Sequence, residues 1–191
     1  MKLDQKVPPL GVLGIIVFVA LVMFFGWGFV VGRPNVDTPP YTQTKLAKLI
    51  VHSFRTSDDM QFYFTTFDIR EVEEFVNASF DFIKPRRHSA DWEAQEKLRD
   101  KWYEKSAEAQ NSYEKILARF DEDELSSLTY DGFEIMDCDI DSNTDRTIGK
   151  RFVISMHSDF ASYTLDSEYI IETDDGWKCA GKMKLTEYDT E

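Results

Sequence analysis

Cysteine and histidine are scarce in this chain of 191 residues, which has two cysteines and three histidines. Cys138 and Cys179 allow at most one disulfide, and they form neither a C-x-x-C motif nor a metal-binding framework. The sequence leaves two alternatives for them, one disulfide or two buried free thiols. It also lacks a phosphate-binding loop, a dinucleotide fingerprint, a nucleophile elbow and a histidine-rich zinc pattern. We therefore expect no catalytic residue, cofactor or metal site.

Basic residues are also fewer than acidic ones: the chain has 22 lysines and arginines and 35 acidic residues, which gives a net charge of -13. Residues 1–32 contribute +1 through Lys2, Lys6 and Asp4, so the remainder of the chain carries -14. This acidity argues against nucleic acid as a partner and against a domain lying flat on an anionic lipid surface. Fifteen Phe, eight Tyr and four Trp are ample for a packed core.

Charged residues, Asn and Gln are all absent from one stretch, residues 10–31, which has the sequence LGVLGIIVFVALVMFFGWGFVV. As a helix it would be about 33 Å long, enough to cross the hydrocarbon core of a bilayer. A cleaved signal peptide is the alternative, but its apolar region is roughly 7–15 residues long and ends at small residues. The pattern predicts a retained transmembrane helix over residues 10–32, after an N-terminal tail, residues 1–9.

The membrane orientation and compartment follow less directly from the flanking charges. Lys2, Lys6 and the terminal amino group favour an N-terminus on the inside and a C-terminal domain on the outside. We expect a single-pass membrane protein, either of the bacterial inner membrane with a periplasmic domain or of an organelle inner membrane such as the mitochondrial one.

The rest of the chain divides into a linker, a domain and a short tail. Residues 33–40, RPNVDTPP, contain three prolines that cannot continue a helix, so they form a Pro-rich linker to a soluble domain over residues 41–185. Residues 186–191 are a tail. Apolar spacing predicts a first helix from about Thr42 or Thr44 to Ser57. Residues 61–67, QFYFTTF, favour a strand, with an extension of the first helix as the alternative.

Two further helices are indicated by their start signals. Asp68 and Glu71 form a capping box, which predicts a helix that continues through Ile83 and is stopped by Pro85. Ser89 opens a long, highly charged helix that runs to about Phe120. Four consecutive acidic residues, 121–124, make a poor continuation of this helix, since they would lie at the negative end of the helix dipole.

Four strands are expected after Thr129, over residues 133–140, 147–158, 162–173 and 177–185, with turn signals at Asp131-Gly132 and at Asp174-Asp175-Gly176. In the third strand Tyr163, Leu165, Tyr169 and Ile171 share one face. In the fourth strand the alternation places Trp177, Cys179, Met183 and Leu185 on the core face, and Lys178, Lys182 and Lys184 toward solvent. The class is therefore α+β, with helices packed on a curved antiparallel sheet.

The order of elements, closing in the hairpin Asp175-Gly176-Trp177-Lys178, resembles the cystatin-like (NTF2-like) fold over about residues 41–185. One N-terminal span followed by such a domain resembles VirB8-type components of bacterial secretion machines and Mce-associated proteins. This resemblance implies a strongly bent sheet wrapped around helices, and a non-enzymatic role in assembly.

Two groups of residues suggest chemistry, and each has a simpler explanation. The alternating oxygens of Asp137, Asp139, Asp141, Asn143 and Asp145 are spaced like Ca²⁺ ligands, but Ser142 and Ile148 stand where an EF-hand needs Gly and Glu. An acidic solvated hairpin loop is the preferred interpretation.

Some NTF2-like enzymes use a His/Asp or Tyr/Asp group for proton transfer inside the cone that the bent sheet forms. The resemblance therefore implies an acid–base site at His157, Asp159 and Tyr163, which lie close together in the sequence. A surface histidine is the preferred interpretation. Tyr169 would be a further polar group in such an interior. A membrane-tethered enzyme or small-ligand-binding domain is accordingly the alternative function.

The leading functional prediction is a non-catalytic structural or assembly subunit of a larger membrane protein complex. Trp92, Leu98 and Trp102 lie on the most polar half of the longest helix, where an isolated domain has least need of large apolar side chains. Lys84, Arg86 and Arg87 form the one basic cluster of an acidic domain. These six residues are the predicted partner contacts, and the partners are the lipid bilayer and other subunits of the complex.

Overall fold

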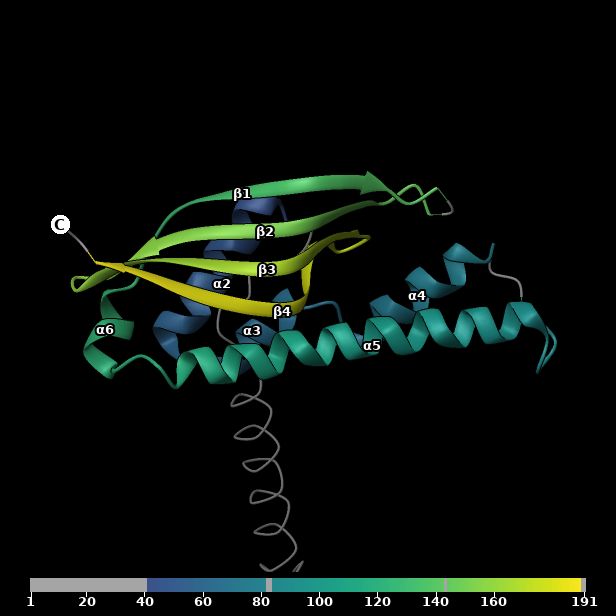
Figure 1. The fold of residues 1–191 in the computed structure, drawn as a ribbon, viewed down its shortest axis with the longest axis horizontal. Helices are drawn as coiled ribbons and strands as arrows, with labels where there is room; N and C mark the ends of the chain where they lie inside the picture. Colours follow the sequence, from purple (N-terminus) through teal and green to yellow (C-terminus); the bar gives the residue numbers. More distant parts are fainter. Residues whose placement is uncertain (1–40, 82–83, 143, 190–191) are drawn as a thin grey trace, which may run out of the picture. The chain divides into compact units, whose positions relative to one another are not determined.

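The computed structural model describes residues 41–81, 84–142 and 144–189 (Figure 1). The predicted transmembrane helix, residues 10–32, and the predicted linker, residues 33–40, lie outside this part of the chain. Among the described residues, no helix is both long enough and apolar enough to cross a membrane. The described residues all belong to one compact unit.

A four-stranded antiparallel sheet forms the C-terminal part of the domain, which confirms the α+β prediction. Its strands are β1 (Thr129–Ile140), β2 (Thr147–His157), β3 (Ala161–Thr173) and β4 (Gly176–Asp189), and they pair in the order of the chain. β1 begins before the expected Phe133, because its first residue pairs with His157. β4 continues past the expected end at Leu185 and pairs as far as Asp189 with Ala161.

Five helices are described before the sheet: α2 (Gln43–Thr56), α3 (Asp59–Thr65), α4 (Ile69–Ser79), α5 (Ala90–Leu117) and α6 (Glu122–Ser127). The predicted capping box is present, since the Asp68 side chain accepts from the Glu71 amide and the Glu71 side chain accepts from the Asp68 amide. Ser89 caps the start of α5, as predicted.

The predicted strand over residues 61–67 is wrong, because this segment is the helix α3 followed by a short extended stretch. The Asp58 side chain accepts a hydrogen bond from the Gln61 amide at 2.9 Å and so begins a separate helix directly after α2. Within this segment the described structure has one isolated bridge, from Thr66 to Cys179 at the outer edge of β4.

Two other helix boundaries differ from the prediction. α4 ends at Ser79, well before Pro85, and the Phe80 amide bonds to carbonyls of the last turn. Residues 122–127 form the short helix α6, which was not predicted, because Asp121 caps a new helix after α5 has ended. The acidic residues there lie at the positive N-terminal end of that helix, where negative charge is favourable.

The main core lies between one face of the sheet and α2, α3 and the second half of α5. Phe62 of α3 stacks on Tyr113 of α5 with their ring centroids 4.1 Å apart, and Phe54 of α2 packs on the same ring at 4.6 Å. Figure 1 shows α5 running alongside β4 and continuing past the end of the sheet beside α4. Burial of these rings ties three helices to the sheet.

A second, smaller core covers the opposite side of the sheet at its far end. Ile170 belongs to the main core, whereas its neighbour Ile171 belongs to the second core, which also holds Ala180 and side chains of α4 and α5. Successive residues of β3 are therefore both buried, because α4 and α5 pack against the face that α2 leaves open. Since the pairing register shifts between Ser167 and Tyr169, the predicted alternation in β3 does not continue through this bend.

Candidate functional site

The most distinctive surface feature is a helical arm, which we define as α4 (Ile69–Ser79) and residues 90–103 of α5. The arm is braced by Glu73 of α4, which accepts a hydrogen bond from the Tyr103 hydroxyl and one from Arg99 Nε at 2.8 Å. Arg99 also binds Glu96 one turn earlier. Burial alone would raise the pKa of Glu73, but the bonds from Tyr103 and Arg99 outweigh it and leave the pKa below its ordinary value.

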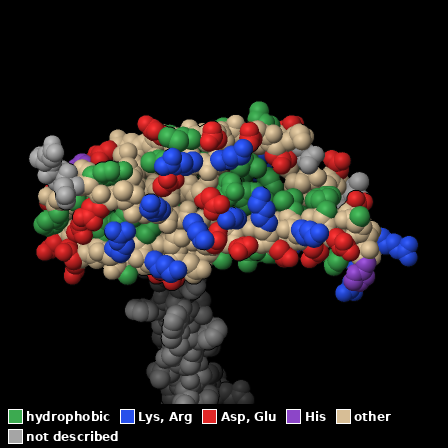
Figure 2. Space-filling view, viewed as in Figure 1, with side chains coloured by type: hydrophobic (Ala, Val, Ile, Leu, Met, Phe, Trp, Pro, Cys, Tyr) green, Lys and Arg blue, Asp and Glu red, His purple; other side chains and the backbone are tan. Residues whose placement is uncertain are grey.

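Residues 84–92 lead into α5 and form its first turn, and they carry the basic cluster. We call these residues the tip of the arm. Lys84, Arg86 and Arg87 are all exposed. Beside them the His88 and Trp92 rings meet edge to face with their centroids 5.1 Å apart, and Trp92 is half-buried. Figure 2 shows basic and histidine side chains together where α5 begins, at one end of the domain. The tip thus presents positive charge next to an aromatic surface.

The predicted partner contacts are only partly brought together by the fold. Lys84, Arg86, Arg87 and Trp92 share the tip, whereas Leu98 lies partly buried against the second core. Trp102 is 3% exposed, so the expectation that it could serve as a surface contact is wrong. Its ring lies 5.6 Å from those of Phe67 and Phe75 and 5.5 Å from that of Tyr169, centroid to centroid.

The role of Trp102 explains why a polar helix contains a large aromatic residue. It fills the space between the arm and the end of β3, and so it anchors the arm to the sheet. Its indole nitrogen has no hydrogen-bond acceptor among the described residues, since aromatic rings surround it. Sequence periodicity does not indicate that the sheet is covered on both faces at this end, and Trp102 was therefore predicted to lie at the surface.

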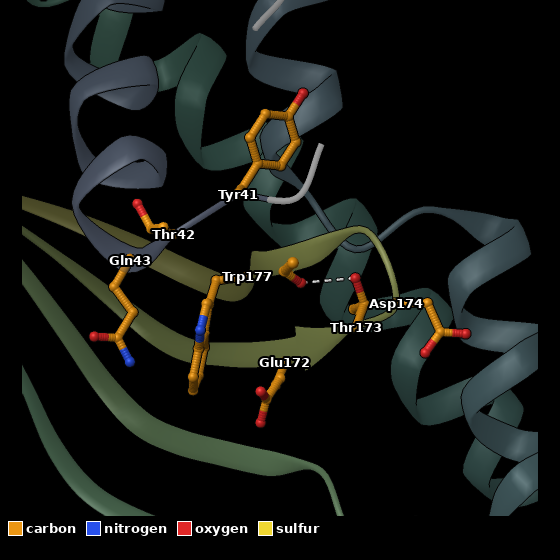
Figure 3. Close-up of a pocket in the computed structure, with 8 residues that line it drawn as sticks. Tyr41, Thr42, Gln43, Glu172, Thr173, Asp174 and Trp177 are labelled. Carbon is orange, nitrogen blue, oxygen red and sulfur yellow. Dashed lines mark hydrogen bonds between the residues drawn. The ribbon is translucent and has the colours of Figure 1, made fainter. Parts of the chain in front are cut away.

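A shallow pocket of about 420 Å³ lies where the chain enters the domain (Figure 3). Tyr41, Thr42 and Gln43 line one side, and the β3–β4 hairpin with Glu172, Thr173, Asp174, Gly176 and Trp177 lines the other.

The polar groups of this pocket serve the fold. The Thr173 hydroxyl donates to the Gly176 carbonyl at 2.7 Å, and Glu172 accepts from the Thr147 amide at 3.2 Å. Asp174 pairs with Arg146 at 2.9 Å. In Figure 3 the Asp174 side chain points away from Trp177, so the acidic groups do not converge on one point in the pocket. We therefore do not place the functional site here.

A buried ion pair was missed by the sequence analysis, which placed Lys178 in solvent. Lys178 Nζ lies 3.3 Å from Glu71 Oε1 and donates to the Phe64 carbonyl at 2.8 Å, and both side chains are almost fully buried. Burial raises the pKa of Glu71, although the charge of Lys178 opposes this shift. The alternation pattern failed because α3 and α4 cover the outer edge of β4, where Lys178 sits.

The suggested acid–base residues do not form a common site in the described part of the chain. His157 Nδ1 lies 2.7 Å from Asp131 Oδ1 of β1, on the solvent side of the sheet. Tyr163 pairs in register with Met156, so it faces the core, where its hydroxyl donates to Glu124. Burial and this bond raise the pKa of Tyr163 to about 12. Tyr169 packs on Trp102 in the second core.

The acidic β1–β2 loop is held by local bonds. Asp141 accepts from the Thr144 amide at 3.0 Å, and Asp139 pairs with Lys150. Residue 143 lies outside the described part, and within that part no group of three or more His, Cys, Asp or Glu side chains is placed to hold a metal ion. The cysteines are both free, with Cys179 buried in β4 and Cys138 exposed in β1.

Comparison with known proteins yields no relative, because no family, no curated protein and no solved structure matches this chain.

Proposed function

We propose that the chain is a single-pass membrane protein that acts as a non-catalytic structural or assembly subunit of a larger membrane protein complex. The observation that carries this proposal is the tip of the arm, where Arg86 and Arg87 are exposed beside the ring of Trp92. Arginine and tryptophan are the residues that most often dominate binding energy at protein interfaces. The tip is therefore the surface best suited to hold a partner.

The rigidity of the arm supports this role. The bonds from Tyr103 and Arg99 to Glu73 join α4 to α5, and Trp102 fixes α5 to the sheet. A contact presented on a braced element loses little conformational entropy on binding. The predicted apolar span over residues 10–32 would hold the domain at the membrane, where other subunits of the complex lie.

The charge of the tip indicates the kind of partner. Most of the chain is acidic, with a net charge of -13, whereas Lys84, Arg86 and Arg87 give the tip a local excess of positive charge. Complementary charge steers association and selects partners. We propose that the tip binds an acidic surface of another subunit.

We further propose that residues 41–185 have the cystatin-like (NTF2-like) fold. The helices precede a four-stranded antiparallel sheet, and the pairing register shifts where the sheet bends in β3. These features support the assignment, which concerns the fold and leaves the function to the tip.

The test compares two full-length variants by gentle solubilisation of native membranes and mass spectrometry of the chains that co-purify. Arg86→Gln with Arg87→Gln removes two positive charges from the tip. Lys115→Gln with Lys184→Gln, at exposed positions on the last turn of α5 and on β4, removes the same charge elsewhere.

The tip variant should lose most of its co-purifying partners at 150 mM salt, while the control variant keeps them. Equal recovery of partners with both variants would overturn the assignment of the tip. Absence of any stoichiometric partner with the unaltered chain would overturn the assembly role itself.

A further inference from the structure

The outer face of α3 is apolar, although surface helices usually present polar side chains to water. Met60, Tyr63 and Phe64 are spaced i, i+3 and i+4, so they share this face, which we call the α3 apolar face. They are 60%, 37% and 40% exposed, and the rings of Tyr63 and Phe64 touch edge to face. Ile69, the first residue of α4, is 65% exposed.

Exposed apolar side chains are concentrated in this short segment. Large hydrophobic residues are exposed at eight described positions, and half of these lie within residues 60–69. The eight are Met60, Tyr63, Phe64, Ile69, Met136, Ile140, Phe160 and Tyr188. Scattered single residues need no explanation, but a continuous face on one helix points to a surface that is covered in use.

The α3 apolar face lies beside the point where the chain enters the domain. Lys178 Nζ donates to the Phe64 carbonyl at 2.8 Å and lies 5.1 Å from the centre of the Tyr41 ring. Tyr41 is fixed to the β3–β4 hairpin, because its amide donates to Asp175 at 3.0 Å and its carbonyl accepts from Trp177 at 2.9 Å. The face is therefore adjacent to Tyr41, the residue that directly follows the predicted linker, residues 33–40.

The predicted linker, residues 33–40, would keep this part of the domain near the bilayer as a short tether. The predicted span ends at Gly32, and the eight residues 33–40 can reach at most about 29 Å, whatever their conformation. A short tether turns docking into an intramolecular event with an effective concentration on the order of millimolar. A small apolar face can then be occupied even when its intrinsic affinity for lipid is weak.

We propose that the α3 apolar face docks into the interface of a zwitterionic phospholipid bilayer. This inference rests on the proposed membrane anchor and goes beyond the assembly role. Aromatic, Met and Ile side chains suit the boundary between headgroups and acyl chains, where the Tyr63 hydroxyl can remain among polar groups. Asp58 and Asp59 at the start of α3 and the acidic domain disfavour an anionic leaflet, so neutral headgroups are the chemistry that fits.

The test measures the accessibility of spin labels in full-length protein reconstituted into phosphatidylcholine liposomes. Met60→Cys and Phe64→Cys are labelled in a Cys138→Ser background, where the remaining Cys179 is buried. The controls are Cys138 itself, which is exposed, and Ile140→Cys, a large apolar position that is 71% exposed on β1. Collision rates with oxygen, which concentrates in lipid, and with a water-soluble nickel chelate are then compared.

Labels at positions 60 and 64 should show an oxygen-to-nickel ratio several-fold above that of both controls, and a 30% phosphatidylglycerol liposome should lower this ratio. Equal ratios at all four positions would overturn the docking. Low access to both reagents at positions 60 and 64 would mean a protein contact and would overturn it as well. Flotation of each labelled sample tests the anchor separately, since an anchored chain with water-exposed labels contradicts only this inference.

Discussion

Lys178 of β4 and Glu71 of α4 form a buried ion pair, 3.3 Å apart, that links the capping box of a helix to the edge of the sheet. Glu71 also lies 3.2 Å from the Thr173 hydroxyl, and Lys178 also binds the Phe64 carbonyl. Four elements, α3, α4, β3 and β4, thus meet at one pair of charges. Because each charge is desolvated, the pair is stable only while both partners are present.

This relationship predicts strong coupling between the two residues. Glu71→Gln or Lys178→Met alone should each lower the free energy of unfolding by about 3 kcal/mol or more, since each leaves a buried group without its partner. The double variant should lose much less than the sum of the two. Urea unfolding of residues 38–191 measures this cycle, and additive losses would contradict the account.

The pH dependence of the Lys178→Met variant follows from the same site. Burial raises the pKa of Glu71, and removing the opposing lysine should raise it further. A carboxyl group with a raised native pKa binds more protons in the folded state, so its stabilising contribution is lost as the pH rises through that pKa. As the pH is raised from 5 to 8, the urea concentration at the unfolding midpoint should therefore decrease more steeply for this variant than for the unaltered domain.

Gly176 of the β3–β4 hairpin should be indispensable for holding Tyr41 against the hairpin. Gly176 has φ +97°, and a Cβ atom there would lie 2.2 Å from the backbone nitrogen of Tyr41. Gly176→Ala should therefore cost about 2 kcal/mol or more and expose the Tyr41 amide to hydrogen exchange. Gly132→Ala is the matched control, because a Cβ there meets nothing within 4 Å. Similar exchange at Tyr41 in the two variants would contradict this close approach.

The two tryptophans of α5 should behave differently when replaced. Trp102→Ala removes a ring from the second core and should cost about 3–5 kcal/mol. Trp92→Gln changes a half-buried residue at the tip and should cost about 1 kcal/mol or less. Thermal unfolding followed by circular dichroism measures both, and a large loss for Trp92→Gln would make it a core residue and remove it from the interaction surface.

The two cysteines should differ in reactivity, and no disulfide should form between them. Cys138 and Cys179 lie on β1 and β4 with two strands between them, which at about 4.8 Å per strand is too far for a bond. Burial raises the pKa of the Cys179 thiol to about 12. A maleimide at pH 7 should modify one thiol in the native domain and two in 6 M guanidinium. Two rapid modifications under native conditions would contradict the burial of Cys179.

Local signals in the sequence predicted much of the fold. The meander order, the capping box at Asp68 and the start of α5 at Ser89 all follow from residues close in the chain. The error at residues 61–67 arose because aromatic residues suit strands, whereas the Asp58 cap and packing of Phe62 on Tyr113 make the segment helical. Tertiary contacts decided that competition.

The surface was harder to predict than the fold for a related reason. The basic cluster could be read from the sequence, since three cations in an acidic domain stand out. The burial of Trp102 and Lys178 could not, because both depend on the arm and α3 covering parts of the sheet that a simple meander leaves open. Periodicity describes one element at a time and carries no information on such second contacts.

Site-specific photocrosslinking in native membranes tests the assembly role most directly. A photoreactive phenylalanine analogue replaces Trp92 at the tip, and, as the control, Tyr188, which is 52% exposed at the end of β4. The account predicts a discrete crosslinked species from position 92 that is lost when Arg86 and Arg87 are changed to Gln, and none of equal yield from position 188. Absence of a crosslink at position 92, or equal crosslinking at both positions, would contradict it.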